Sequence, residues 1–413
     1  MSESLQTRSL GEPSVAEVIL GQSPPSSAYN DAEDGLPFFQ GKADFGLMHP
    51  TPRMWCNAGQ KFAKAGDVLM SVRAPVGDVN IATGDCVIGR GIAAVRAGAE
   101  VDPWFLYFAL LHSKPILEAR ATGSTFASVN KTTLHELEIP FAKHPEQTAI
   151  GSVLRLVVEK LGQEGQAVDT AQELKRATMR ELFTRGLRGE AQKDTEIGLV
   201  PESWAPRTIL ELCEIWSGGT PRKSVAEYWS GDIPWVSGKD LKLPALDDAI
   251  DHVSAEGVEA ASRLAPQGAV LLLVRGMGLA KDLPVAVINR PMAFNQDVKA
   301  LVSRGVYSGQ FLRSAIYAGK DRLLSQIVPS AHGTMTLNLN DVETFKIACP
   351  TDPDEAAEIV TILDALDRKI ALHRQKRAVL EELFQSLLHK LMTGEICVAD
   401  LDLSALPPAS ATA

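Results

Sequence analysis

The chain carries the same succession of sequence patterns twice. Residues 65–73 (AGDVLMSVR) correspond to residues 267–275 (QGAVLLLVR), and residues 175–177 (KRA) correspond to residues 376–378 (KRA). The two copies keep the same order of strand signals, turns and a long helix, while their loops differ in length. A period close to half the chain is too long for a solenoid and is typical of a duplicated unit made of a domain and a helix. Such a duplication predicts a protein that handles a two-part ligand.

The length and composition allow two globular domains. The chain has 413 residues, of which 45% are hydrophobic and 22% are charged. Two long stretches are rich in glycine, proline and short β-favouring runs, so the predicted fold class is α+β, with two pseudo-symmetric α/β domains separated by two long antiparallel coiled-coil helices. The predicted segments are a first domain at 14–142, a central spacer helix at 143–190, a linker at 191–206, a second domain at 207–350, a distal spacer helix at 351–396 and a flexible tail at 397–413.

The segment after each domain has the pattern of a long helix. In the second copy Asp352 can cap the helix, Pro353 suits its first turn and Glu355 lies three residues after the cap. Each helix can run for about 40 residues, or about 60 Å, with one apolar stripe. Gly162 and Gly165 predict a less regular path for the first helix. A lone stripe needs a partner, so we expect the helices to pack against each other, unless the stripes are the cores of two helical subdomains.

Several function classes are disfavoured by the sequence. The five cysteines are scattered without C-x-x-C spacing, and the histidines show no ligand spacing, so neither a disulfide framework nor a metal site is expected. The first residues are polar and no apolar run is long enough to cross a bilayer, which predicts a cytoplasmic protein with no membrane partner. A net charge of −10 argues against a chain that coats nucleic acid alone, although a locally basic cleft remains compatible with it.

The sequence contains residues suited to reading DNA but no convincing catalytic set. Residues 218–224 (GGTPRKS) lack the glycine that precedes the lysine of a P-loop, and Asp297-Val298-Lys299 is too little for a nuclease. Arginine can pair with guanine, and asparagine or glutamine with adenine. Each such residue is also a common surface hydrogen bonder. The candidate DNA contacts are Lys42, Ser71, Arg73, Arg90, Lys131, Lys239, Arg275, Asn295, Gln296, Lys299 and Thr334. The candidate contacts within the spacer or with a partner are Leu174, Leu182, Phe183, Leu380, Phe384, Leu387 and Leu391.

Several motifs resemble one known family. Residues 195–204 (TEIGLVPESW), followed by the Gly-Thr-Pro at 219–221 and by residues 231–241 (GDIPWVSGKDL), are similar to the specificity subunit of type I restriction-modification systems. Arg185-Gly186 and residues 391–396 (LMTGEI) resemble the central and distal spacer regions of that family. With the duplication included, the resemblance extends over nearly the whole chain.

The resemblance implies a non-catalytic subunit that reads double-stranded DNA. Each target recognition domain would bind one half of a split site, and the two helices would set the gap. Two methyltransferase subunits would be recruited to methylate adenine, and a motor-endonuclease subunit can join them. S-adenosylmethionine, ATP and Mg²⁺ would be bound by these partners and none by this chain. Residues 36–45 (LPFFQGKADF) differ from residues 233–241 (IPWVSGKDL), so the two domains should read different bases. The alternative is a scaffold whose domains bind protein and whose coiled coil spaces them.

Overall fold

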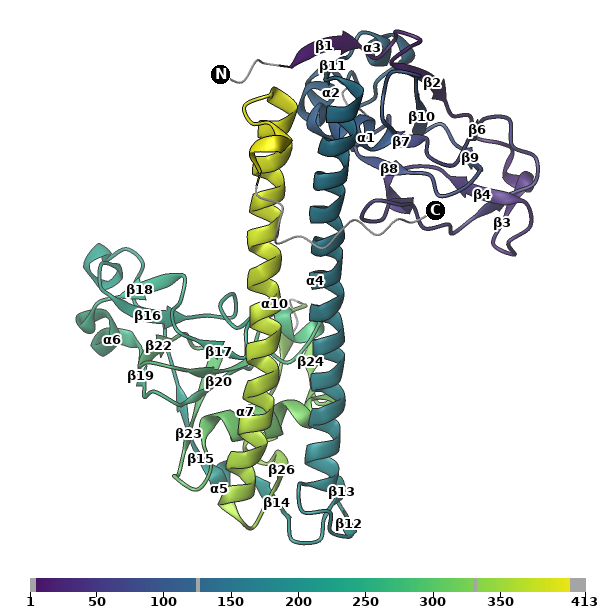
Figure 1. Ribbon diagram of the computed structural model, residues 1–413. Helices are drawn as coiled ribbons and strands as arrows, with labels where there is room; N and C mark the ends of the chain where they lie inside the picture. The colour runs from purple at the N-terminus through teal and green to yellow at the C-terminus, as the bar shows by residue number, and fades with distance from the viewer. Residues whose placement is uncertain (1–4, 124–126, 330–332, 402–413) are drawn as a thin grey trace. The chain divides into compact units, whose positions relative to one another are not determined.

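A computed structural model describes residues 5–123, 127–329 and 333–401. The chain divides into two compact units, each with a β-rich globule and a segment of both long helices (Figure 1). Unit 1 comprises residues 1–168 and 372–413, and unit 2 comprises residues 169–371. The expected mixed fold with a repeated domain and long helices is confirmed. The unit boundary falls within both helices, so this division differs from the six segments predicted along the sequence, whose limits stay predictions.

Unit 1 contains two main sheets. An antiparallel sheet has the strand order β2 (Ala16–Leu20), β10 (Ile92–Ala97), β7 (Val68–Ser71), β8 (Val79–Ile81). A mixed sheet has the order β3 (Tyr29–Asn30), β5 (Trp55–Cys56), β4 (Leu36–Phe39), β9 (Cys86–Ile88), β6 (Phe62–Ala63). Within it, β4 and β9 are parallel. The helices of the globule are α1 (Pro103–His112), α2 (Lys114–Arg120) and α3 (Lys131–His135). Helix α1 begins where Asp102 accepts two backbone N–H groups, and its residues 105–110 are buried.

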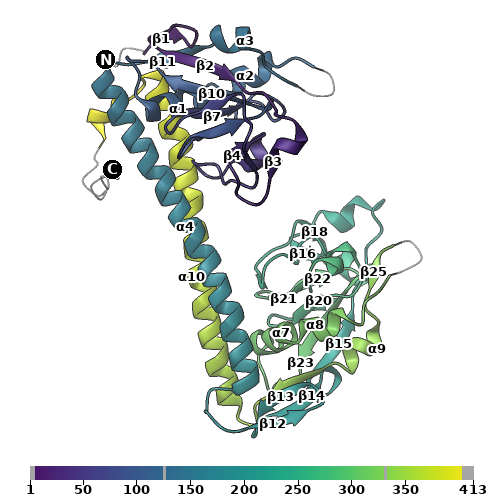
Figure 2. The ribbon, with the colours of Figure 1, turned by 90° about the vertical axis from the view of Figure 1, so that its right-hand side faces the viewer.

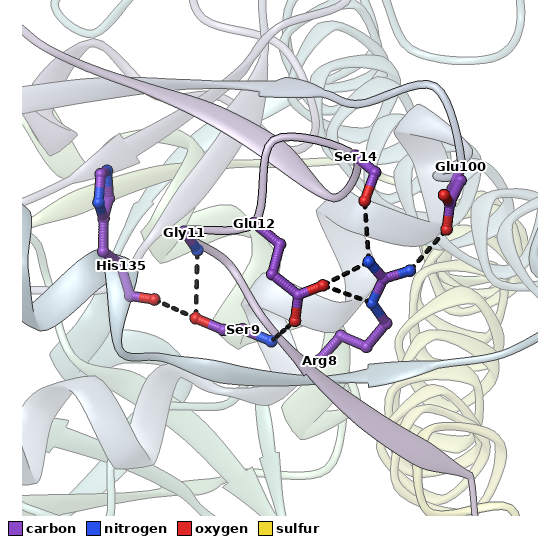
Figure 3. A network of polar contacts seen from close by, with 7 residues as sticks. All are labelled: Arg8, Ser9, Gly11, Glu12, Ser14, Glu100 and His135. Atoms are coloured by element: carbon purple, nitrogen blue, oxygen red, sulfur yellow. Dashed lines mark hydrogen bonds and ion pairs between the residues drawn. The ribbon is translucent and has the colours of Figure 1, made fainter.

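The first strand ties the start of the chain to unit 1. Strand β1 (Gln6–Ser9) pairs antiparallel with β11 (Glu138–Phe141). The Arg8 guanidinium donates hydrogen bonds to Glu12, to Glu100 at 2.5 Å and to Ser14 at 2.8 Å (Figure 3). The Arg8 hydrogen bond is the main reason that the pKa of the Glu12 carboxyl lies below its usual value. This network joins β1 to a loop more than ninety residues further along the chain.

Unit 2 repeats the arrangement of unit 1. Its first sheet has the order β15 (Cys213–Ser217), β23 (Val298–Ser303), β20 (Val270–Leu273), β21 (Val285–Ile288), β17 (Ala245–Leu246). Its second sheet has the order β18 (Asp251–Val253), β16 (Ile233–Val236), β22 (Met292–Phe294), β19 (Leu264–Ala265). Strands β16 and β22 are parallel, as β4 and β9 are in unit 1. The central order β15-β23-β20-β21 therefore matches β2-β10-β7-β8.

The remaining elements of unit 2 are short strands and short helices (Figure 2). The pair β14 (Ala205–Thr208) and β26 (Lys346–Cys349) corresponds to β1 and β11. The two small hairpins are β12 (Gln192–Thr195) with β13 (Gly198–Pro201), and β24 (Val328–Pro329) with β25 (Met335–Thr336). The short helices are α5 (Ile209–Leu212), α6 (Ala255–Ala261), α7 (Gly309–Ala318), α8 (Lys320–Leu324) and α9 (Leu339–Glu343).

The two long helices are α4 (His144–Arg185) and α10 (Pro353–Thr393), with 42 and 41 residues. Within each unit their segments lie side by side and antiparallel (Figure 1, Figure 2). In unit 1, the His373 Nδ1 lies 2.6 Å from a carboxylate oxygen of Glu164, and in unit 2, Lys175 and Asp367 form an ion pair at 2.5 Å. The helices thus share the cores of the units, and the alternative of two independent helical subdomains is not needed.

The predicted irregularity of the first helix is wrong. Helix α4 continues through Gly162 and Gly165 without a break. A Cβ atom at Gly162 would lie 2.9 Å from a methyl carbon of Leu47, whereas nothing lies within 4 Å of one at Gly165. The first glycine accompanies a close approach of the loop around Leu47 to the helix, and the second is simply exposed to open space. Neither glycine interrupts the backbone hydrogen bonds that hold the helix.

The predicted spacer residues differ in their burial. Leu182, Phe183, Phe384 and Leu391 are buried in the unit cores, and Leu380 and Leu387 are half-buried. Leu174 is 51% exposed, so it does not belong to the stripe that packs against α10. Its assignment to a partner surface stays a prediction.

The predicted flexible tail is partly folded. Residues Val398–Asp400 form a short 3₁₀ helix, and Val398 packs against the core of unit 1. Residues 402–413 lie outside the described residues. Across the described ranges, no helix is both long enough and apolar enough to span a bilayer.

Candidate nucleic-acid interface

Four loops of unit 2 meet where the parallel strands β16 and β22 end. Carboxyl ends of parallel strands share one edge of a sheet, and these ends lead into residues 237–240 and 295–297. The loop after β15 joins them, because the Gly219 N–H donates to the Phe294 carbonyl at 3.0 Å. The loop after β20 joins them through the Val274 N–H, which donates to the Asp297 carbonyl at 2.8 Å. We define the second edge as residues 218–224, 237–240, 274–277 and 295–297.

Unit 1 has the same junction. The parallel strands β4 and β9 end side by side, and the Gly89 N–H donates to the Phe39 carbonyl at 2.8 Å. The loop after β7 joins through the Val72 N–H, which donates to the Gly91 carbonyl at 2.9 Å. The loop after β2 joins through the N–H of residue 22, which donates a hydrogen bond to the carbonyl of residue 88. We define the first edge as residues 21–25, 40–44, 72–74 and 89–91.

The second edge collects most of the predicted contacts of its domain. Lys239, Arg275 and Gln296 are exposed there. The Lys239 ammonium pairs with Asp251 at 2.9 Å, and this hydrogen bond raises the pKa of Lys239. The Arg275 guanidinium pairs with Asp297 at 3.2 Å, with 58% of its side chain exposed. Solvent screens exposed pairs of this kind, so these cations can turn to a phosphate or a base at little cost.

Three other predicted residues of unit 2 are less accessible. Asn295 is 8% exposed, and its side-chain oxygen accepts the Asp297 N–H at 3.1 Å. It therefore shapes the turn after β22, and its prediction as a base contact is not supported by its placement. Lys299 is half-buried and donates to the Ser217 hydroxyl at 2.7 Å. Thr334 is half-buried and precedes Met335, whose carbonyl accepts the N–H of Gly276 in the second edge.

The first edge also presents exposed cations. Arg73 and Arg90 are exposed in it. Lys131, also exposed, lies outside the first edge at the start of α3, two residues after Val129, whose N–H donates to the Val72 carbonyl. Ser71 is only 1% exposed. Its hydroxyl donates to the Pro75 carbonyl at 2.7 Å and accepts the Asp78 N–H at 3.1 Å. Ser71 thus holds the turn between β7 and β8, and its position removes it as a direct base contact.

Lys42 is held at the first edge by a shared carboxylate. Asp78 pairs with Lys42 and with Lys114, each at 2.8 Å. Burial alone would raise the pKa of Asp78, but the two ammonium groups outweigh it and hold the pKa below the usual value. Asp78 therefore stays ionised at neutral pH and keeps Lys42 in place.

A carboxylate closes the turn that carries the lysine at each edge. In unit 2, Asp240 accepts the N–H groups of Ser237 at 2.8 Å and of Ile250 at 2.9 Å. In unit 1, Asp44 accepts the N–H of Gln40 at 2.8 Å. Such side-chain to backbone bonds fix loops that have no ladder partner. Both lysines thus project from turns of defined shape.

The sequence prediction missed four polar residues on the loops that follow β2 in unit 1 and β15 in unit 2. Ser23 contacts Arg90, and Thr220 contacts Gln296. Arg222 and Lys223 are exposed on the same loop as Thr220, and within the described part of the chain neither has an ion-pair partner. The signal for three of them is the Gly-Gly-Thr-Pro-Arg-Lys run at 218–223, in which a hydroxyl and two cations follow a glycine turn.

The edges present hydrogen-bond donors. Among the residues that the structure describes, no group of three or more His, Cys, Asp or Glu could hold a metal ion. Burial raises the pKa of the thiols of Cys86, Cys213 and Cys349 to about 12, so thiolate is scarce at neutral pH. What the edges can do is donate hydrogen bonds from guanidinium, ammonium and amide groups. Phosphates and base edges accept such bonds.

Comparison with known proteins identifies the family. A sequence model described as the type I restriction modification DNA specificity domain matches residues 14–166 and 201–382, which together exceed half the chain. A Methanocaldococcus jannaschii protein named for the MjaX type I restriction enzyme specificity subunit is 38% identical over 180 residues, covering 43% of this chain and 42% of that protein. The EcoR124I/EcoR124II specificity subunit of Escherichia coli is 30% identical over 163 residues, covering 39% of this chain and 40% of that protein.

The aligned stretches thus span less than half the length of these relatives. The fold is similar to the crystal structure of a type I restriction-modification S subunit from M. genitalium, with a TM-score of 0.64 at 18% identity, over 95% of this chain and 96% of that one. The matched segments, one in each copy of the repeat, show that the chain belongs to the family of type I restriction-modification DNA specificity proteins.

Proposed function

We propose that this chain reads a bipartite double-stranded DNA site, one half with each edge, and directs adenine methylation and restriction by partner subunits. The observation that carries the proposal is the recurrence of one edge in both units with different side chains in matching positions. Lys42 and Lys239 match, as do Arg73 and Arg275, whereas Arg90 stands where the second copy has Gln296. A shared frame with altered donors is suited to two half-sites of different sequence.

The chain itself is proposed to be non-catalytic. Two methyltransferase subunits would supply S-adenosylmethionine chemistry, and a motor-endonuclease subunit, where present, would use ATP and Mg²⁺. Partners also account for the net charge of −10, because they can add basic surface around the duplex. The MjaX and EcoR124I/EcoR124II relatives are named as specificity subunits of such enzymes, which supports this assignment.

The test is to express the chain with a methyltransferase partner and map methylated adenines across a genome. We expect methylation at one split sequence, and its loss when the chain is omitted. A complex that methylates without sequence preference, or a chain that leaves the pattern unchanged, would favour the scaffold function instead. Binding measurements add a second criterion. The isolated chain should bind DNA weakly, whereas the complex should bind tightly, with log affinity falling about 0.9 per phosphate contact for each unit of log salt.

The role of the helices in setting the gap can be tested separately. Both helices run from one unit into the other, so matched insertions are needed to keep α4 and α10 paired. Four residues inserted after Val168 and four after Ala371 add about 6 Å and roughly one turn to each helix. Since base pairs rise about 3.4 Å, the gap should lengthen by one or two base pairs while both half-site sequences persist. An unchanged gap in an active complex would mean that the helices do not set the spacing.

A further inference from the structure

A hydroxyl group holds one exposed side chain at the first edge. After β2 ends, the Gln22 N–H donates to the Ile88 carbonyl at 3.0 Å, which fixes the turn against the end of β9. Gly21 permits this approach, because a Cβ there would lie 2.2 Å from the carbonyl oxygen of residue 89. The next residue is Ser23, whose hydroxyl accepts from the Arg90 backbone N–H at 3.2 Å and from its Nε at 3.3 Å.

The second edge contains the same construction. After β15 ends, the Gly219 N–H donates to the Phe294 carbonyl at 3.0 Å. A Cβ at Gly218 would lie 2.1 Å from that carbonyl oxygen, so only glycine fits. The next residue is Thr220, whose hydroxyl donates to the Gln296 Oε1 at 2.6 Å.

The two constructions match position by position. Each has a glycine in close contact with the neighbouring strand and one backbone hydrogen bond of 3.0 Å to that strand. A half-buried residue with a hydroxyl group follows, and then a buried proline, Pro24 or Pro221. In each, the side chain that contacts the hydroxyl is exposed. It belongs to the second residue after the one whose carbonyl accepts the backbone hydrogen bond, Ile88 in unit 1 and Phe294 in unit 2. The difference is the held side chain, which is Arg90 in unit 1 and Gln296 in unit 2.

We propose that the hydroxyl-held side chain reads one base in each half-site, with Arg90 binding a guanine and Gln296 binding an adenine. Ser23 and Thr220 are then positioning residues that orient the readers. This inference rests on the proposed function, since it assumes that each edge faces DNA. It adds which residue discriminates at one position of each half-site and which base that residue selects.

The chemistry of the groups supports this pairing. A guanidinium held through its Nε keeps both terminal nitrogens available for the O6 and N7 acceptors of guanine. A carboxamide oxygen has two lone pairs, so Gln296 can accept from Thr220 and from the adenine N6 amino group, while its Nε2 donates to N7. A hydroxyl carries one donor and two acceptor sites, so a serine or threonine at the same place can hold either reader. Within the described ranges, no carboxylate pairs with Arg90, so this side chain need not leave an ion pair to bind a base.

The decisive experiment exchanges the two readers in the complete complex with its methyltransferase partner. For R90Q we expect one position of the first half-site to change from guanine to adenine. For Q296R we expect one position of the second half-site to change from adenine to guanine. Each change should amount to roughly a 10- to 100-fold altered preference, and the other half-site should stay unchanged. The readout is the genome-wide methylation pattern together with binding to DNA libraries randomised in one half-site. R207Q, which removes a charge on β14 outside the second edge, is the control and should keep both half-sites.

The hydroxyl is tested by T220V and by T220S. T220V should lower the preference at the same base several-fold without changing which base is preferred, and T220S should retain the wild-type preference. An unaltered preference in R90Q and Q296R would overturn the assignment of the readers, and an unaltered preference in T220V would overturn the role of the hydroxyl. These outcomes require a wild-type complex that is sequence-specific; a wild-type complex without specificity would instead contradict the proposed function.

Discussion

The buried carboxylate of Glu355 offers a sharp test of how unit 2 is held together. Glu355 lies in the first turn of α10 and is 1% exposed. Its Oε1 accepts the Leu187 N–H at 2.7 Å, and its Oε2 accepts the Trp204 Nε1–H at 3.1 Å. Gly186, with φ of +64°, turns the chain just after α4 ends. One side chain therefore joins the end of α4, the linker to the second domain and the start of α10.

The substitution E355Q keeps the volume but exchanges one oxygen for an amino group. The carboxamide can accept only one of the two N–H donors, and its own NH₂ then faces the other. A buried donor left without an acceptor costs about 1–3 kcal/mol, so E355Q should lower the free energy of unfolding of unit 2 by about that amount. Removing the indole donor with W204F should relieve the conflict, because the carboxamide oxygen can then serve Leu187 alone. E355Q should therefore cost about 1–2 kcal/mol less in the W204F background than in the wild type.

The free energies can be measured by denaturant unfolding followed by circular dichroism, with calorimetry to separate the transitions of the two units. The matched control is E358Q, because Glu358 pairs with Arg188 at 2.9 Å on the exposed side of the same helix turn. Solvent screens that pair, so E358Q should change the free energy of unfolding far less than E355Q. Equal stability of E355Q and E358Q, or effects of E355Q and W204F that add within about 0.5 kcal/mol, would contradict this role of Glu355.

Three further outcomes follow from the structure. The pKa of Asp78 is lower in the folded protein than in the unfolded chain, so its carboxylate stabilises the fold at pH values above the unfolded pKa. D78N should therefore lower the free energy of unfolding at neutral pH. Unfolding measured at each pH should show the difference between D78N and the wild type shrinking as the pH falls from about 5 toward 3. G165A should raise the stability of unit 1 by about 0.5–1 kcal/mol in thermal unfolding, since open space surrounds that helical glycine, whereas G186A should lower the stability of unit 2 because its φ is positive. R275A should weaken binding to the second half-site by about 1–3 kcal/mol in competition binding, and equal loss on unrelated DNA would make it a phosphate contact.

The architecture could be predicted because it depends on patterns that the chain repeats. The strand signals before Arg73 and Arg275 form the central strands β7 and β20, and the apolar stripes after Pro145 and Pro353 form the buried faces of α4 and α10. Periodicity reports which face of an element is buried, and a duplicated pattern reports it twice. Leu174, a predicted spacer or partner contact, is 51% exposed, because a near-heptad pattern over a long straight helix drifts from the true contact face between the helices.

The polar residues of the edges were harder to predict, for a physical reason. Ser71 and Asn295 both follow strand signals, as Arg73 and Gln296 do, and all four have hydrogen-bonding side chains. Short side chains such as serine and asparagine commonly bond to their own backbone in turns, and both do so here. Long side chains reach past the turn to solvent. Side-chain length near a turn would therefore have separated the structural residues from the exposed ones.

The contacts of Ser23 with Arg90 and of Thr220 with Gln296 could be found only from the fold. Ser23 and Arg90 are far apart in sequence, as are Thr220 and Gln296, and each pair meets only because an outer strand of one sheet ends beside the parallel pair of the other. In both copies the glycine before the hydroxyl is fixed by a carbonyl about 2 Å from where its Cβ would be, so the turn has little freedom to vary. The held residue is exposed in both copies. At this position the two copies therefore differ in the donor pattern offered to a ligand, while the backbone turn that presents it is the same. Under the proposed function, a duplicated domain built this way would acquire a new half-site by substituting a few exposed residues, without repacking either core.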